Sequence, residues 1–356
     1  MGRLKKGNNN MYTIYDYLKY YKDDSLETLP WNMMDNLLCS ILSYVPLKSF
    51  NKLKLKELID NVIENPIKEN DLMRPMVLKV IDLIKNSKRY KDMCFENFIN
   101  MRDNNTQFGV MTIKLNNIKV ISFKGTDGSV IGWLENFRLI YIYPTNTHKL
   151  AIEYVKNNIN VLDEDVYVLG HSKGGNLAMV SSMEQNDSKF SKIKQVINFD
   201  GPGFRKCEFE SEKYKKLLPK LINIIPTGSY IGTILYNKKY HVVTSNSHAI
   251  NEHYPTSWNI FGTKFVTGKL SIGSKEINKR TTIEMSKLDE NKIKEIIEYV
   301  FKTFEGRISE KGKISFKELS EVLKSMHNMD KELSSYISII LKTLMSLSNV
   351  QNKTSK

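Results

Sequence analysis

The spacing of apolar positions predicts helices in the first part of the chain. From Met34 to Val45 apolar residues recur every three or four positions, and a proline then ends the run, because the residue before a proline disfavours helical backbone. Segments 53–63 and 76–84 follow the same period. We therefore expect residues 12–100 to be helical.

Beyond this region the pattern changes to that of short strands. Two β-rich runs, 108–115 and 118–123, flank Asn116-Asn117, a pair that tolerates the positive φ of a two-residue hairpin turn. Apolar runs then alternate with helical segments, which is typical of a mostly parallel sheet with helices on its faces. The predicted strands are 166–169, 196–199, 221–225 and 240–244, and the predicted helices are 147–157 and 175–183.

From about residue 270 the chain is again helical and charged. An apolar stripe with helical spacing covers 293–304, and Ser315 with Glu318 forms a capping box for a further helix. These changes of pattern divide the chain into five regions. The regions are a disordered N-terminus (1–11), a helical N-terminal region packed on the core (12–105), an α/β core (106–269), a helical C-terminal extension (270–350) and a frayed tail (351–356).

Composition is that of an ordinary globular protein. The 356 residues are 41% apolar and 26% charged, which supplies a core and excludes collagen-like and low-complexity architectures. The three cysteines have no CxxC spacing, so they predict neither a disulfide framework nor a zinc site, and a reducing, cytoplasmic compartment is the simplest interpretation. We expect no transmembrane segment, since no apolar run is long enough, and no secretion signal follows the basic N-terminus.

The charge balance bears on partners. The net charge is +14, from 53 Lys and Arg against 39 Asp and Glu, and such an excess attracts nucleic acid or an anionic membrane surface. Because the lysines are scattered and no nucleic-acid-binding motif accompanies them, we expect no nucleic-acid partner. Peripheral contact with an anionic membrane surface stays open as an alternative.

One motif carries catalytic chemistry. Residues 170–174 read Gly-His-Ser-Lys-Gly, directly after the predicted strand 166–169 and directly before a predicted helix. This is the context of a nucleophile elbow, in which a strained turn presents a serine hydroxyl at the end of a sheet. Ser172 is therefore the candidate nucleophile. The alternative is a glycine-rich turn with an ordinary serine.

A serine nucleophile also needs an oxyanion hole, made of N–H groups aimed at the developing negative charge. The N–H of Lys173, the residue after the nucleophile, is one candidate donor. The other comes from the glycine-containing loop that ends the strand 118–123, where Thr126 is the first choice and Asp127 the second. That loop has the alternative of being a plain turn.

The general base is sought among six histidines. His248 and His253 lie in the loop after the last predicted strand, where the chain order serine, acid, histidine puts the base. We prefer His253, because a proline-containing turn and a tryptophan follow it. His171 is expected to point away from Ser172, although it is the neighbouring residue.

A longer series of motifs runs through the chain in a fixed order. The motifs are Tyr17-Leu18, Asp35-Asn36-Leu37, Leu42-Ser43-Tyr44, residues 123–127 with Gly132-Trp133, residues 170–178, residues 198–204, His253 and Trp258. In this order, over roughly residues 12–265, the sequence resembles the Mbeg1-like family of bacterial α/β-hydrolase-fold proteins, which is related in pattern to class 3 lipases. The resemblance implies an α/β-hydrolase core with Ser172 as nucleophile and His253 as base, and it implies no particular substrate.

The acid of the triad departs from the lipase pattern. In class 3 lipases an aspartate follows the strand that corresponds to 221–225, whereas residues 226–230 of this chain carry no carboxylate. Asp200, at the end of the preceding strand, is the nearest alternative, because neighbouring strands lie about 5 Å apart. Glu252 and Asp127 are the other candidates, and Asp200 also fits a purely turn-forming role.

The sequence thus predicts an α/β-hydrolase fold, a mostly parallel sheet flanked by helices, with helical N-terminal and C-terminal regions. The predicted function is a serine hydrolase that cleaves a carboxylic ester, of a lipid or another acyl compound, through an acyl-enzyme. That chemistry needs no metal or cofactor. The rival is a hydrolase-fold binding or regulatory protein with weak or no catalysis, favoured by the missing lipase-type acid.

Overall fold

The fold is known from a computed structural model of the chain. The predicted disordered N-terminus (1–11), most of the predicted C-terminal extension and the frayed tail (351–356) lie outside the part that it describes. The described residues are 12–67, 73–103, 106–126, 135–136, 138–284, 289, 291, 293–295 and 297–298.

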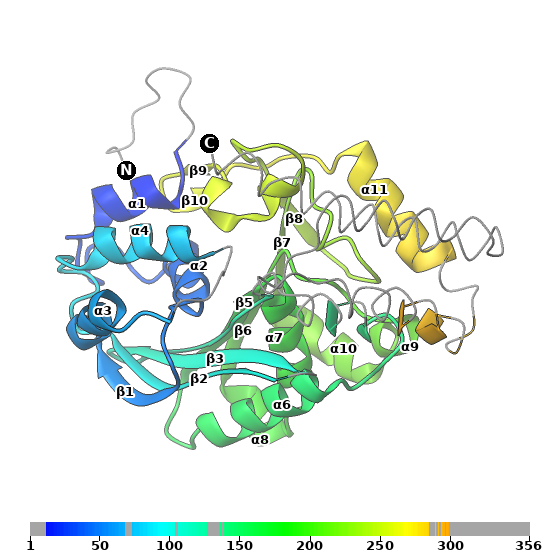
Figure 1. Cartoon of the computed structure of the whole chain (residues 1–356), viewed down its shortest axis with the longest axis horizontal. Helices are drawn as coiled ribbons and strands as arrows, with labels where there is room; N and C mark the ends of the chain where they lie inside the picture. Colours follow the sequence, from blue (N-terminus) through cyan, green and yellow to red (C-terminus); the bar gives the residue numbers. More distant parts are fainter. Residues whose placement is uncertain are drawn as a thin grey trace.

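A sheet of eight strands forms the centre of the molecule (Figure 1). Neighbours in the sheet are neighbours in the chain: the first three pairings are antiparallel and the last four are parallel. The predicted mostly parallel sheet is confirmed. The strands are β1 (Phe50–Lys54), β2 (Cys94–Arg102), β3 (Gln107–Leu115), β4 (Ile118–Phe123), β5 (Asp165–His171), β6 (Ile193–Phe199), β7 (Leu221–Pro226) and β8 (Tyr240–Val243), with a separate ribbon of β9 (Ile260–Phe261) and β10 (Lys264–Phe265).

Two of these strands correct the sequence prediction. The predicted hairpin is present as β3 and β4, with Asn116 at φ 51°. The prediction that residues 12–100 are helical is wrong for β1 and most of β2, which extend the sheet beyond the hairpin. For β2 the reason is a bulge between Glu96 and Ile99, where Asn97 has φ 52°. A bulge interrupts the alternation of inward and outward side chains by which strands are recognised.

Helices lie on both faces of the sheet (Figure 1). The helices predicted at 34–45, 53–63, 76–84, 147–157 and 175–183 are confirmed, with ends that differ by a few residues. Those predicted at 293–304 and after Ser315 lie largely outside the described residues. The helices are α1 (Ile14–Tyr21), α2 (Met33–Leu42), α3 (Leu55–Glu64), α4 (Arg74–Ile84), α6 (Asn146–Asn158), α7 (Lys173–Met183), α8 (Asp187–Lys192), α9 (Lys206–Phe209), α10 (Glu212–Leu217) and α11 (Ile272–Lys279), with short helical turns η1 (Leu218–Lys220), η2 (Ala249–His253), η3 (Pro255–Ser257) and η4 (Arg280–Glu284).

Two hydrophobic clusters sandwich the sheet. Along β5, Val168 belongs to the cluster that contains α6 and α7, and Leu169 belongs to the cluster that contains α1 to α4. On β4, Ile121 and Val120 divide in the same way. Successive side chains of a strand point to opposite faces, and each buried side chain of this size contributes roughly 1.5–3 kcal/mol. The N-terminal helices are therefore one of the two layers that stabilise the sheet.

A buried ion pair joins the N-terminal helices. Arg89 donates from Nη2 to Oδ2 of Asp35 at 2.7 Å, and both side chains are 0% exposed. Arg89 also donates to the Leu29 carbonyl, and Asp35 accepts the N–H of Asn32 at the start of α2. Every charge of this pair has hydrogen-bond partners, so losing one member would leave the other buried and unpaired.

Candidate active site

Ser172 lies on the sharp turn between β5 and α7. Its φ of 59° and ψ of −133° fall in a region that non-glycine residues rarely adopt. Its N–H donates to the Phe199 carbonyl of β6 at 2.9 Å, which helps to hold the strained turn. A Cβ on Gly174 would lie 2.2 Å from the Phe123 carbonyl oxygen, so only glycine lets α7 approach β4 here. The predicted strand-turn-helix context of Ser172 is present.

The predicted oxyanion loop lies beside this turn. A Cβ on Gly125 would lie 2.9 Å from Cβ of Ser172. The N–H of Gly125 donates to Oη of Tyr44 at 2.9 Å, and its carbonyl accepts from Nε2 of Gln107 at 3.2 Å. The N–H and C=O of a trans peptide point in opposite directions. The N–H of Thr126 therefore points away from Gln107, with an orientation that the Gln107 hydrogen bond restrains.

A buried network connects the loop to the elbow. Nζ of Lys173 lies 2.6 Å from Oε2 of Glu135 and 2.8 Å from Oε1 of Gln107. The same Glu135 oxygen accepts the N–H of Gln107 at 3.1 Å, and Asn136 donates to Oγ1 of Thr126 at 2.8 Å. The side chain of Lys173 is thus occupied within the protein. Sequence reasoning missed this pair, because Lys and Glu are rarely fully buried and no local pattern marks them. Asp127 lies outside the described residues.

The structure brings Asp200 and His253 together. Nδ1 of His253 lies 2.6 Å from Oδ2 of Asp200. The carboxylate is 0% exposed, and its other oxygen accepts the Ser229 hydroxyl and, at 3.1 Å, the N–H of Gly232. When Asp200 is ionised, its carboxylate can only accept, so Nδ1 of His253 then carries the shared proton and Nε2 is left with a lone pair. That is the tautomer in which a histidine takes a proton from a serine.

Burial governs the charge of this pair. It raises the pKa of the Asp200 carboxyl to about 7, and the hydrogen bonds from Ser229 and Gly232 oppose the rise. It lowers the pKa of His253 to about 3. The imidazole is therefore neutral at pH 7, which is the form that a general base requires.

The turn after β7, where a lipase-type acid is missing, supports Asp200. It supplies the Ser229 hydroxyl, and α11 holds the segment that follows it: Nδ2 of Asn278 donates to the Thr233 carbonyl at 2.9 Å. Glu252 does not contact His253 through its carboxylate, which instead accepts the N–H of Gly228 at 2.8 Å. Glu252 is therefore a support of the turn, and no sequence signal pointed to Ser229.

His171 was expected to point away from Ser172, and the structure places its ring against the loop that carries His253. The His171 and His253 rings are 4.5 Å apart between centroids, and Nε2 of His171 lies 2.8 Å from the His253 carbonyl oxygen. Nδ1 of His171 lies 3.0 Å from Oη of Tyr44. Tyr44 belongs to one of the motifs of the family resemblance, which was the only sequence signal for it.

His148 has a structural environment. Its Nε2 lies 2.8 Å from Oδ1 of Asn176 in α7, and its Nδ1 accepts the N–H of Thr145 at 3.2 Å. Asn176 in turn donates to the Gly203 carbonyl at 2.9 Å, in the loop after Asp200. Burial lowers the pKa of His148 to about 4. This histidine therefore joins α6 to the elements that carry the candidate site.

Across the described residues, His, Cys, Asp and Glu side chains form no metal-binding group.

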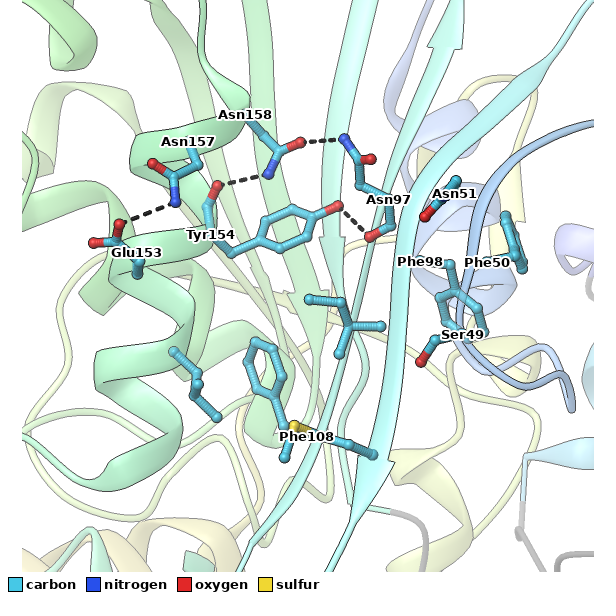
Figure 2. Close-up of a pocket in the computed structure, with 13 residues that line it drawn as sticks. Ser49, Phe50, Asn51, Asn97, Phe98, Phe108, Glu153, Tyr154, Asn157 and Asn158 are labelled. Atoms are coloured by element: carbon cyan, nitrogen blue, oxygen red, sulfur yellow. Dashed lines mark hydrogen bonds between the residues drawn. The ribbon is translucent and has the colours of Figure 1, made fainter.

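A groove of about 490 Å³ lies between β2 and α6 (Figure 2). Phe98 and Phe108 contribute to its apolar wall, and Asn97 donates from Nδ2 to Oδ1 of Asn158 at 2.7 Å across its rim. The Tyr154 side chain points toward Asn97 and donates from its hydroxyl to the Asn97 carbonyl. The groove is separate from the candidate site, whose nucleophile, acid and base are not among its lining residues.

The match to a family model agrees with the sequence resemblance. A sequence model of the Mbeg1-like family matches residues 84–302, a stretch that contains Ser172, Asp200 and His253 and excludes Tyr44. A crystal structure of M37 lipase is 15% identical with a TM-score of 0.36, over 62% of this chain and 69% of that one. A crystal structure of the extracellular lipase LipA from Serratia marcescens is 14% identical with a TM-score of 0.33, over 56% of this chain and 40% of that one. No curated protein matches.

Proposed function

The chain belongs to the Mbeg1-like family, and from that premise and the surroundings of Ser172 we propose that it is a serine hydrolase that cleaves a carboxylic ester. The observation that carries the proposal is the hydrogen bond of 2.6 Å between His253 and Asp200, formed at the same end of the sheet as the Ser172 elbow.

In the proposed reaction, Oγ of Ser172 attacks the ester carbonyl carbon while Nε2 of His253 takes the serine proton. The N–H groups of Thr126 and Lys173 stabilise the negative charge on the carbonyl oxygen. Asp200 keeps the imidazole in the required tautomer and stabilises the imidazolium. The C–O bond then breaks, the imidazolium protonates the leaving alcohol, and the acyl group stays on the serine. A water molecule, activated by the same base, releases the carboxylic acid.

The test combines an active-site label with hydrolysis. We expect a fluorophosphonate probe to label the wild-type protein and not Ser172→Ala, and we expect p-nitrophenyl esters to be hydrolysed by the wild type alone. Ser182→Ala is the matched control: Ser182 lies in the same helix, and its buried hydroxyl has no partner among the described residues. Labelling that persists in Ser172→Ala contradicts the proposal, and a wild type that neither hydrolyses nor labels supports the rival binding function.

A second, separate proposal is peripheral attachment to an anionic membrane in the cytoplasm. The net charge of +14 supports the attachment. The three free cysteines, Cys39, Cys94 and Cys207, support the cytoplasm as its place. Among the described residues, no helix is long and apolar enough to cross a bilayer. Sedimentation with phosphatidylserine vesicles at low salt, lost at high salt, is the expected result. Equal binding to neutral vesicles contradicts an electrostatic attachment.

A further inference from the structure

One hydrogen-bonded chain connects the oxyanion loop with the base loop. The N–H of Gly125 donates to Oη of Tyr44 at 2.9 Å, Oη of Tyr44 lies 3.0 Å from Nδ1 of His171, and Nε2 of His171 lies 2.8 Å from the carbonyl oxygen of His253. Tyr44 is 1% exposed and His171 is 2% exposed, so water does not compete for these bonds. Gly125 precedes Thr126, and His253 is the proposed base.

The direction of each hydrogen bond follows from the groups. The His253 carbonyl can only accept, so Nε2 of His171 carries a proton and donates it. Burial, reinforced by the nearby His253, lowers the pKa of His171 to about 3, so the ring is neutral and Nδ1 accepts. The Tyr44 hydroxyl therefore donates to Nδ1 of His171 and accepts from Gly125. Donor and acceptor capacity agree at each step of the chain.

We propose that Tyr44 and His171 are positioning residues, which hold the oxyanion loop and the base loop in register for the ester hydrolysis proposed above. The inference rests on that proposed function. Tyr44 holds the N–H of Gly125 and Gln107 holds its carbonyl. Together they fix the orientation of the peptide group that carries the N–H of Thr126. His171 restrains the backbone of His253.

This arrangement gives the N-terminal helical layer a part in the chemistry. Tyr44 directly follows the last turn of α2 and lies before residues 84–302, which the family match covers. α2 is also joined to β4 by the Ser122 hydroxyl, which donates to the Cys39 carbonyl at 3.0 Å. The N-terminal layer therefore contacts the candidate site through the Tyr44 hydroxyl. This hydroxyl bonds Gly125 in the oxyanion loop and, through His171, reaches the loop that carries His253.

The size of the effect follows from geometry. Tyr44→Phe removes a hydroxyl and leaves the N–H of Gly125 and Nδ1 of His171 without their partner, which favours a small shift of both loops. A misplacement of about 1 Å in an active site costs up to about 10²-fold in rate. The loss should appear in kcat, because the shifted groups act on the transition state, and leave KM nearly unchanged.

The first experiment compares Tyr44→Phe with Tyr154→Phe in the full chain. The Tyr154 hydroxyl is likewise buried with two partners, Thr112 at 3.0 Å and the Asn97 carbonyl at 2.9 Å, but it packs with the other hydrophobic cluster. We expect both variants to melt at lower temperature, and only Tyr44→Phe to lose kcat on a p-nitrophenyl ester, by about 10- to 100-fold. Equal losses of kcat in the two variants would mean that activity follows stability, and overturn the proposal.

The second experiment separates hydrogen bonding from ring packing. His171→Phe keeps a flat ring against His253 but cannot donate, whereas His171→Gln keeps an N–H donor. We expect His171→Gln to retain more kcat than His171→Phe. If the wild type is active and Tyr44→Phe keeps its kcat, or the order of the two His171 variants is reversed, the inference is wrong. A wild type without Ser172-dependent hydrolysis overturns the proposed function itself, and this inference with it.

Discussion

Oδ2 of Asp200 lies 2.6 Å from Nδ1 of His253, although the aspartate directly follows β6 and the histidine follows β8. The strand between them, β7, ends in a turn whose Ser229 hydroxyl donates to the other oxygen of Asp200. The carboxylate thus comes from one strand and its support comes from the next. In our proposal the acid therefore follows β6, and the turn after β7, where the lipase pattern led us to look for an acid, supplies its support.

This arrangement predicts that the carboxylate can be moved from position 200 to position 229. We expect Asp200→Asn to lower kcat by about 10⁴-fold, because the imidazole loses its tautomer and its counter-charge. Adding Ser229→Asp to that variant should restore at least about tenfold, since the new carboxylate starts from a strand end only about 5 Å away. Steady-state hydrolysis of a p-nitrophenyl ester measures both effects.

Thermal melting provides the control for the acid variants. Asp200→Asn keeps the shape of the side chain, so its melting temperature should stay close to that of the wild type. A collapse of both melting temperature and activity would make Asp200 a structural turn residue. Unchanged turnover would move the role of the acid to Glu252 or to no carboxylate.

Ser172 and His253 should act as a unit. We expect Ser172→Ala and His253→Ala each to lower kcat by about 10⁴-fold or more, and the double variant to be no worse than the poorer single variant. Losses that multiply in the double variant would show that the two side chains act independently. Circular dichroism spectra of all three variants should match the wild type, because neither side chain belongs to the two hydrophobic clusters.

Acid should destabilise the fold through His148. Burial lowers the folded-state pKa of His148 to about 4 from an ordinary 6.5, so above pH 6.5 neither state binds the proton and its stabilisation is complete. As the pH falls below that value, the unfolded chain takes up a proton that the folded protein excludes. The free energy of unfolding should then fall by about 1.4 kcal/mol per pH unit down to about pH 4.

The difference between wild type and His148→Gln isolates this contribution from that of the carboxylates. Gln keeps an N–H donor for Asn176 but does not titrate. Urea unfolding between about pH 7.5 and about pH 4.5 should therefore show a shallower loss of stability in His148→Gln. Parallel pH profiles of the two proteins would mean that His148 takes up its proton equally in both states.

The ion pair of Asp35 and Arg89 should dominate the stability of the N-terminal layer. We expect Asp35→Asn or Arg89→Met alone to cost about 3–5 kcal/mol, because each leaves a buried, unpaired charge. The double variant should cost clearly less than the sum of the two, as a double-mutant cycle by urea denaturation would show. Additive costs would indicate that the hydrogen bonds of Arg89 to backbone carbonyls, and not its partner, determine the effect.

The sequence by itself determined the features that depend on neighbouring residues. The strand, elbow and helix around Ser172 were predicted because the glycines, the serine and the apolar runs that define them are adjacent in the chain. The β3–β4 hairpin was predicted from its two asparagines and flanking apolar runs, and the longer helices from the 3.6-residue period. His253 and Asp200 were selected by chain order and by strand spacing, with their catalytic roles as predictions.

Only the tertiary structure decided which distant side chains meet. β2 was not predicted, because its bulge disturbs the alternation of inward and outward side chains. Its strand conformation depends on pairing with β3, which the local sequence pattern does not show. Ser229 touches Asp200 from 29 positions away and Tyr44 touches His171 from 127 positions away, and neither contact leaves a trace in local periodicity. The buried Lys173–Glu135 pair is of the same kind. Local structure depends on adjacent residues and can be predicted from them. The candidate site is assembled from several strands and a helical layer, so its contacts depend on how these elements pack on the two faces of the sheet.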